Sequence, residues 1–289
     1  MSYALILMTS LLFALQTLAM KKLRAPAMAD QLRLNAVFMG LGALLLCGYG
    51  MLFQRDVFII GRTTAAFGVL FGFLYAADVL CYLLALGRGP VALTAFFLSA
   101  SMLIPALFGI AFLGERLTLK KGAGILMLVC AMFLAQQKEQ KAIGARSWIA
   151  LCLLAFLFNG FLSVCQKEQQ TLTRGTEGFG LMLIGYACAS LFSALSAAIA
   201  GGKRRPTGIA GLIRRNAPWL AAIAVCSMLG NLLLTFLASS VDSVLLYPLS
   251  QGGLLVLLAL ASVLIYRERG GRRAFGGLVL GIAAMILIA

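Results

Sequence analysis

The sequence contains no histidine, and only 9 of its 289 residues are Asp or Glu. Histidine is the commonest metal ligand and general base, so its absence argues against a metal centre or an acid–base enzyme. The seven cysteines all lie within apolar runs and form no CxxC pair, which argues against a disulfide framework. We therefore expect no cofactor, no bound metal and no enzymatic activity.

Charged residues of either sign are also scarce. They make up 11% of the chain and hydrophobic residues 62%, whereas roughly a quarter of a soluble domain is charged. This composition predicts an integral membrane protein whose partner is the lipid bilayer. The net charge of +15 sits in short basic clusters between apolar runs, which is typical of cytoplasmic loops and not of a nucleic-acid-binding face.

The apolar runs have the length of membrane-spanning helices, which need about 20 residues each. Strand alternation of the barrel kind is absent, so we expect an all-α protein. The ten predicted spans are residues 2–20, 31–53, 64–86, 90–113, 119–136, 147–165, 179–200, 217–238, 243–266 and 272–289.

The second half of the chain echoes the first. Residues 78–136 slide onto residues 231–289 without a gap. The informative matches are Glu115 with Glu268, Arg116 with Arg269, Gly124 with Gly277, and Asp78 with Asn231. A unit of five spans begins and ends on opposite sides of the membrane, because five is an odd number. A second copy in the same chain therefore has the inverted orientation. We predict two inverted five-helix repeats, residues 1–138 and 146–289, around a central cavity that holds the substrate site.

These repeated segments carry a resemblance to a known family. The stretches are "FLGERLTLKKGAGILMLVCAMFLA" (112–135), "YPLSQGG" (247–253) and "RERGGRRAFGGLVLGIAAM" (267–285), with the Lys21-Lys22 close of the first span. The chain resembles an EamA-type, ten-helix member of the drug/metabolite transporter superfamily. The resemblance implies a basket-like bundle with the fifth and tenth helices outside.

The basic residues also predict an orientation. Most of the 24 Lys and Arg fall in the loops that follow the first, third, fifth, seventh and ninth spans, which all lie on one side of the membrane. Examples are Lys21, Lys22 and residues 203–205. The positive-inside rule then places both termini outside, in a plasma or inner cell membrane. Many relatives are thought to have both termini inside.

Asp78, in "LYAADVLCYLL", is the one acid deep inside an apolar run. A carboxylate at that depth costs about 2.5–3.5 kcal/mol on insertion scales unless it faces water or a partner. Because burial disfavours the ionised form, Asp78 is a candidate to bind a proton or a cationic substrate group. The alternative is a structural hydrogen bond to a neighbouring helix, with Asn231 or a free backbone carbonyl as the partner. Tyr75 and Tyr82 share its helix face and could cage a cation, although aromatics at this spacing more often pack.

Polar amides form a second group of candidates. Gln16 and Asn159 occupy near-equivalent places in the first and sixth spans, where amides either line a cavity or join helices. Small multidrug-resistance relatives carry an essential glutamate in their first helix. This chain has Gln16 there instead, so that mode of proton exchange is not carried over.

The motif "YPLSQGG" predicts a break in the ninth span at Pro248. Freed carbonyls there, together with Tyr247, Ser250 and Gln251, could face the cavity, because irregular backbone at depth survives only in protein or water. The competing interpretation is a kink for packing. Pro105 is the rough counterpart in the fourth span.

Glu115 and Glu268 are the acids of the repeated motif, and each lies beside an arginine, Arg116 or Arg269. Inverted repeats place the two glutamates on opposite membrane faces, so they cannot form a catalytic pair. We expect them to fix loops through charge and capping. Gly124 and Gly277 are expected to be structural.

The sequence therefore predicts a secondary transporter that works by alternating access. Its expected cargo is a small neutral, zwitterionic or cationic metabolite, such as an amino acid, an amine or a drug-like solute, with proton coupling through Asp78. The alternative function is a lipid-translocating protein or a membrane scaffold. The identity of the cargo, the direction of transport and homodimer formation stay open.

Overall fold

The computed structural model describes residues 2–53, 58, 60–89, 91–135, 146–201, 208–264 and 272–289. The regular structure of these residues is helical. The helices are α1 (Ser2–Met20), α2 (Met28–Leu52), α3 (Arg62–Leu86), α4 (Val91–Ala100), α5 (Leu103–Phe112), α6 (Leu119–Ala135), α7 (Arg146–Leu172), α8 (Gly178–Gly201), α9 (Ile209–Ala238), α10 (Ser243–Leu264) and α11 (Arg272–Ile288).

The helices have the lengths and composition of membrane spans. In the described part of the chain, 8 stretches are long and apolar enough to cross a membrane, and α4 and α5 form one of them together. The remaining two helices, α6 and α11, have 17 residues each. The predicted all-α membrane architecture is therefore confirmed.

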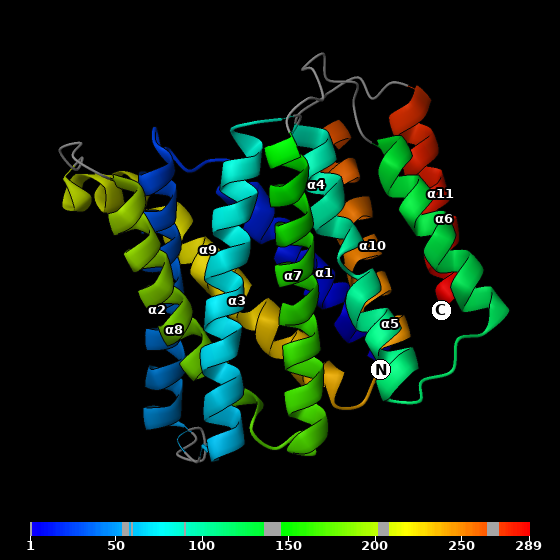
Figure 1. Cartoon of the computed structure of the whole chain (residues 1–289), viewed down its shortest axis with the longest axis horizontal. Coiled ribbons are helices and arrows are strands. Elements are labelled where there is room, and N and C mark those ends of the chain that lie inside the picture. Colours follow the sequence, from blue (N-terminus) through cyan, green and yellow to red (C-terminus); the bar gives the residue numbers. More distant parts are fainter. Residues whose placement is uncertain are drawn as a thin grey trace.

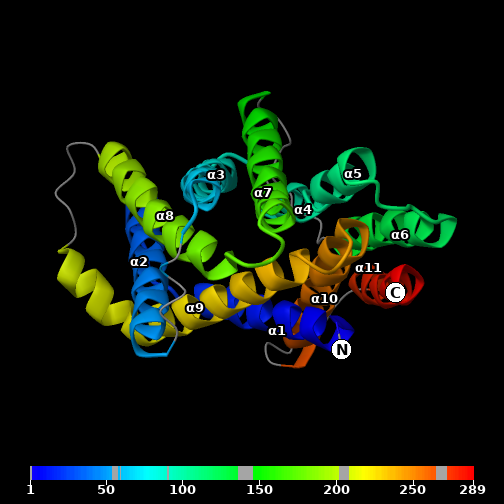
Figure 2. The ribbon, with the colours of Figure 1, turned by 90° about the horizontal axis from the view of Figure 1, so that it is seen from below.

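The helices stand roughly side by side, and consecutive spans run up and down the bundle (Figure 1). α2 packs on α8, α3 packs on α7 and α8, and α1 packs on α9 and α10. α6 and α11 pair with each other at one edge of the bundle in both views (Figures 1 and 2). The Tyr3 hydroxyl donates to the carbonyl oxygen of Ala289 at 2.9 Å, so the two chain ends meet in the lower half of the bundle in Figure 1.

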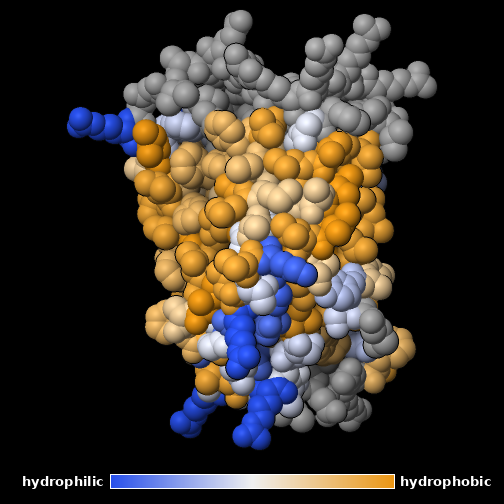
Figure 3. Space-filling model, turned by 90° about the vertical axis from the view of Figure 1, so that its right-hand side faces the viewer, coloured by the Kyte–Doolittle hydropathy of each residue, from blue (hydrophilic) through white to orange (hydrophobic). Residues whose placement is uncertain are grey.

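The face formed by α5, α6 and α11 is predominantly hydrophobic (Figure 3). Its exposed apolar side chains include Leu107, Phe112, Leu126, Phe133 and Ile286. Hydrophilic residues gather on the lower part of the same face. Such a broad apolar surface is suited to contact with lipid tails and not with water.

The interruption between α4 and α5 has a local cause. Pro105 cannot donate a backbone hydrogen bond, and its ring clashes with the carbonyl four residues earlier, which belongs to Ser101. The helix accordingly breaks at residues 101 and 102, and the Ser101 carbonyl instead accepts from the Ile104 N–H at 3.0 Å.

The predicted break at Pro248 was wrong. α10 continues through this proline without interruption. Only five residues of α10 precede Pro248, so its ring disturbs a single turn. That turn is also held from outside, because the Glu115 carboxylate accepts from the Val244 N–H at 3.0 Å.

The predicted end of the sixth span at residue 165 was also wrong. α7 continues to Leu172 and carries a polar stretch, residues 166–170, into the bundle. Lys167 is buried there and does not belong to a loop, where the predicted end of the span had placed it. Arg33 likewise lies inside α2.

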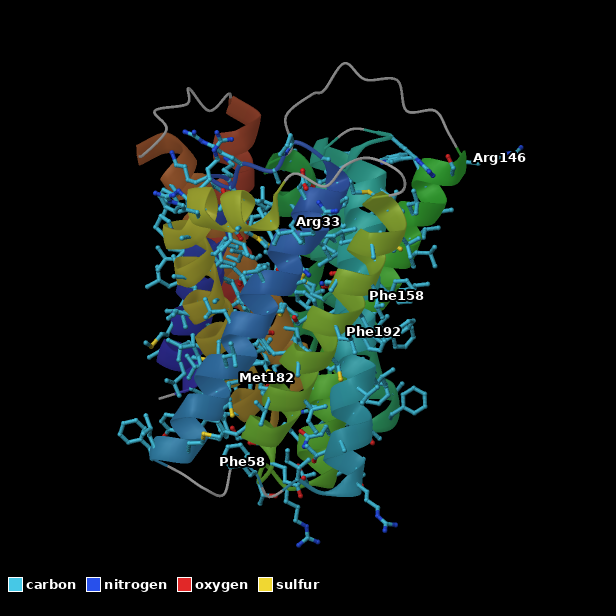
Figure 4. The ribbon with its side chains drawn as sticks, turned by 90° about the vertical axis from the view of Figure 1, so that its left-hand side faces the viewer. Arg33, Phe58, Arg146, Phe158, Met182 and Phe192 are labelled. Atoms are coloured by element: carbon cyan, nitrogen blue, oxygen red, sulfur yellow. The ribbon has the colours of Figure 1, made fainter. Side chains whose placement is uncertain are left out.

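Glycine allows α3 and α8 to approach each other closely. A Cβ atom at Gly72 would lie 2.7 Å from the backbone nitrogen of Ala189, closer than real Cβ contacts. Beside this contact, the Phe73 ring packs edge-on against Phe158 of α7 and Phe192 of α8, which are labelled in Figure 4.

Candidate polar site on α3 and α7

Asp78 lies in α3 and is 5% exposed. Its Oδ2 atom accepts a hydrogen bond from the Asn159 side chain of α7 at 3.1 Å. Its Oδ1 atom is buried and has no hydrogen-bond partner among the described residues. The alternative interpretation named Asn231 or a free carbonyl as the partner of Asp78 on a neighbouring helix; the partner is Asn159, and the Asn231 amide donates elsewhere.

Asn159 also connects Asp78 to the break between α4 and α5. Its Oδ1 atom lies 2.6 Å from the Ser101 hydroxyl, and the same hydroxyl lies 2.6 Å from the Leu98 carbonyl oxygen. A hydroxyl group has one proton to donate, so Ser101 has two acceptors in competition. Two hydrogen bonds, from Asn159 to Asp78 and from Ser101 to Asn159, therefore connect the carboxylate to the irregular backbone.

A second polar cluster lies on α8 and α9. The Asn231 amide donates to the Tyr186 hydroxyl at 3.1 Å and to the Ser227 carbonyl oxygen at 3.0 Å. The hydroxyls of Tyr186 and Ser227 lie 2.9 Å apart.

The two tyrosines expected near Asp78 differ in their surroundings. Tyr75 is partly buried, and its ring stacks on Phe71 with centroids 6.4 Å apart. Tyr82 is also partly buried. The stacking on Phe71 occupies one face of the Tyr75 ring.

The remaining candidates do not join the Asp78 cluster. Tyr247 donates to the Ser163 carbonyl oxygen at 2.7 Å, and the Ser250 carbonyl accepts from the Ser10 hydroxyl at 3.0 Å. Gln16 and Gln251 are partly buried, and within the described residues their side chains make no hydrogen bond.

A buried ion pair at the lower end of the bundle was not predicted. The Lys167 ammonium lies 3.4 Å from Glu115 Oε1, and the two side chains are 9% and 6% exposed. Lys167 also donates to the Val241 carbonyl oxygen at 2.8 Å. Glu115 thus joins α7 to the start of α10, which gives its capping role a specific partner.

Glutamines next to Lys167 extend this network. Gln166 donates to the Thr235 hydroxyl at 3.1 Å, and Gln169 donates to the Thr64 hydroxyl at 2.9 Å. The signal for this network was the sequence of residues 166–170, because Gln, Lys and Glu favour helices over turns. The turn residues come later, at Gly175, which has a positive φ of 77°.

Other structural candidates lie at helix contacts or outside the described residues. A Cβ atom at Gly124 of α6 would lie 3.1 Å from the Ala284 carbonyl of α11, and Gly277 is buried in α11. Arg116 is exposed beside Glu115. Glu268 and Arg269 lie outside the described residues.

These features define a multi-pass helical membrane protein with a carboxylate held deep in its bundle. Residues 1–136, a little under half of the chain, match the EamA-like transporter family. The resemblance seen in the sequence is therefore confirmed over this segment, and the matched family is one of membrane transporters of the drug/metabolite transporter superfamily.

One protein of known crystal structure shares the fold over nearly the whole chain. The TM-score is 0.78, with 99% of this chain and 95% of that chain covered, at 18% sequence identity. Similarity at this identity establishes the shared fold alone. No curated protein matches the chain.

Proposed function

We propose that the protein is a secondary transporter for a small neutral, zwitterionic or cationic metabolite, and that Asp78 binds either a proton or the cationic group of the cargo. The observation that carries this proposal is the Oδ1 atom of Asp78, which has no hydrogen-bond partner among the described residues although the residue is only 5% exposed. An ionised carboxylate at bilayer depth is costly without a compensating partner. Binding of a proton or a cation removes that cost.

The packing of the helices supports two inverted repeats, residues 1–138 and 146–289. If α1 corresponds to α7 and α3 to α9, then the contact between α3 and α7 has its counterpart in the contact between α9 and α1. The pairs α2–α8 and α6–α11 join corresponding helices directly. Corresponding helices also run in opposite directions along the bundle (Figure 1). In transporters built from such repeats, one group of helices moves against the other around a site near the midplane.

The contacts of α7 support a conformation that is closed at the lower end. The described hydrogen bonds from α7 to α9, to α10 and to the loop between them involve Ser163, Gln166 and Lys167. All three follow Asn159, and α7 runs downward in Figure 1, so these bonds lie below the Asp78 site. Access from the lower side requires them to separate.

The buried charges favour a cargo without phosphate groups. Asp78 offers a negative charge, and the buried Lys167 is already paired with Glu115. A multiply charged anion would require unpaired basic groups at the site. We further propose that the lower end faces outside, because the sequence segments that connect helices at the other end contain most of the basic residues.

The test is uptake of amino acids and amines by proteoliposomes, with and without a pH gradient. We expect at least one of these solutes to be taken up, and Asp78→Asn to lose the response to the gradient. Asp242→Asn is the matched control, because Asp242 is 57% exposed in the loop between α9 and α10. Uptake by Asp78→Asn with unchanged rate and pH dependence would rule out the role of Asp78. Lipid scrambling without solute uptake would favour the alternative function.

A further inference from the structure

An apolar groove runs along the face formed by α2, α8 and α9, which is the face shown in Figure 4. Its volume is about 500 Å³. The lining residues are Ala36, Val37, Gly40, Leu41, Leu44, Ser190, Ile213, Ala217 and Leu220. The hydroxyl of Ser190 already donates to the Ala36 carbonyl oxygen at 2.8 Å, so the groove offers little to a polar ligand.

The groove has the depth of one membrane leaflet. From Ala36 to Leu44 it follows α2 for about 12 Å, at 1.5 Å per residue. One leaflet of the hydrocarbon core is about 15 Å deep. An acyl chain that enters from the upper end of α2 therefore fits along the groove.

Basic side chains mark the upper end of the groove. Arg33 lies on the same stripe of α2 as Val37, Gly40 and Leu44, about 4.5 Å above Ala36. Figure 4 shows it toward the upper end of α2. A Cβ atom at Gly201, the last residue of α8, would lie 3.4 Å from the Nη2 atom of Arg33. The Arg33 guanidinium therefore reaches across to α8.

Arg33 retains donors for a further ligand. Its Nη1 atom pairs with Asp30 at 3.0 Å, and its side chain is 19% exposed. A guanidinium group has five N–H donors, of which this pair uses one. On α9, Arg214 is exposed and directly follows the lining residue Ile213. The local charge is therefore positive even with Asp30 included.

We propose that this groove binds one anionic phospholipid, with an acyl chain along α2 and the phosphate group at Arg33 and Arg214. Basic groups between membrane helices at the head end of an apolar groove are suited to an anionic headgroup. The site is separate from the Asp78 cluster and does not depend on the cargo. A bound lipid would hold α2, α8 and α9 together.

The test is native mass spectrometry of the purified full chain, titrated with dioleoylphosphatidylglycerol or dioleoylphosphatidylcholine. We expect one phosphatidylglycerol molecule to bind more tightly than phosphatidylcholine. Ala217→Phe places a ring in the groove from an exposed position and is expected to abolish this binding. Ala222→Phe is the matched control, because Ala222 is exposed on the opposite face of α9.

A second pair of variants tests the headgroup contact. Arg214→Gln is expected to weaken phosphatidylglycerol binding about fivefold, from roughly 1 kcal/mol per basic residue near a membrane surface. Arg116→Gln, an exposed arginine at the lower end, is expected to leave the binding unchanged. Equal binding by Ala217→Phe and Ala222→Phe would overturn the proposal, as would equal affinity for the two lipids.

Discussion

Asn159 is the residue that links Asp78 to the rest of the bundle. It donates to the carboxylate and accepts from the Ser101 hydroxyl. If Asp78 gains a proton or a cation, the hydrogen bond from Asn159 weakens. The Ser101 hydroxyl can then donate its proton to its second acceptor, the Leu98 carbonyl oxygen. We therefore expect a change at the carboxylate to be transmitted to the irregular backbone between α4 and α5.

Replacement of Asn159 by alanine tests this link. Hydrogen bonds to charged groups contribute about 1.5–3 kcal/mol, so we expect Asn159→Ala to slow transport by about tenfold or more. The measurement is the initial rate of uptake in proteoliposomes. Ser163→Ala, one turn further along α7, is the control. A rate for Asn159→Ala equal to that of the control would show that Asn159 does not couple the two sites.

The buried ion pair between Lys167 and Glu115 is expected to affect the free energy of unfolding. Removal of one partner from a buried pair leaves an uncompensated charge, so Lys167→Met should destabilise the protein by about 3–5 kcal/mol. Glu115→Gln combined with Lys167→Met should recover most of this loss, because glutamine can still accept from Val244. The measurement is the free energy of unfolding of the single and the double variant, compared in the same detergent. Equal instability of the single and double variants would contradict the pairing.

At the residue scale the sequence identified Asp78, because it is the one acid deep in an apolar run. The sequence could not identify its partner. Gln16 and Asn159 have the same chemistry and near-equivalent positions in their spans, and only the packing of α3 on α7 distinguishes them. The buried Lys167 was missed because a charged residue at the end of an apolar run resembles a loop residue.

At the scale of helices, the contact between α3 and α8 depends on glycine. Gly72→Ala places a methyl group against the backbone of α8 and should destabilise the protein by about 1–3 kcal/mol. Gly48 of α2 has nothing within 4 Å of its Cβ position. Gly48→Ala should therefore stabilise the protein by about 0.5–1 kcal/mol through the helical preference of alanine. Thermal unfolding in detergent separates the two, and a stable Gly72→Ala variant would argue against close packing of α3 on α8.

The approximate positions of the membrane spans were predictable, because each apolar run has the length that a bilayer demands, although one predicted span is divided into α4 and α5. The effect of each proline was not predictable from the sequence. Pro105 breaks its span, whereas Pro248 lies in the second turn of α10 and leaves the helix continuous. The difference depends on the distance to the start of the helix and on a contact from Glu115, which is remote in sequence.

At the scale of the whole molecule, transport by alternating access requires the lower end of the bundle to open and close. The loops between α7 and α8 and between α9 and α10 meet there, because a Cβ atom at Gly175 would lie 3.0 Å from the Ser239 Cβ atom. Disulfides need Cβ atoms about 3.5–4.5 Å apart, so a small shift allows one to form between cysteines at these positions. Seven native cysteines must first be replaced in a background shown to transport.

The most direct measurement is uptake by the Gly175→Cys, Ser239→Cys variant before and after oxidation. The reduced form controls for the strain of a cysteine at a position with positive φ. If alternating access operates through this end, oxidation abolishes uptake and reduction restores it. Undiminished uptake by the fully cross-linked protein would contradict the account.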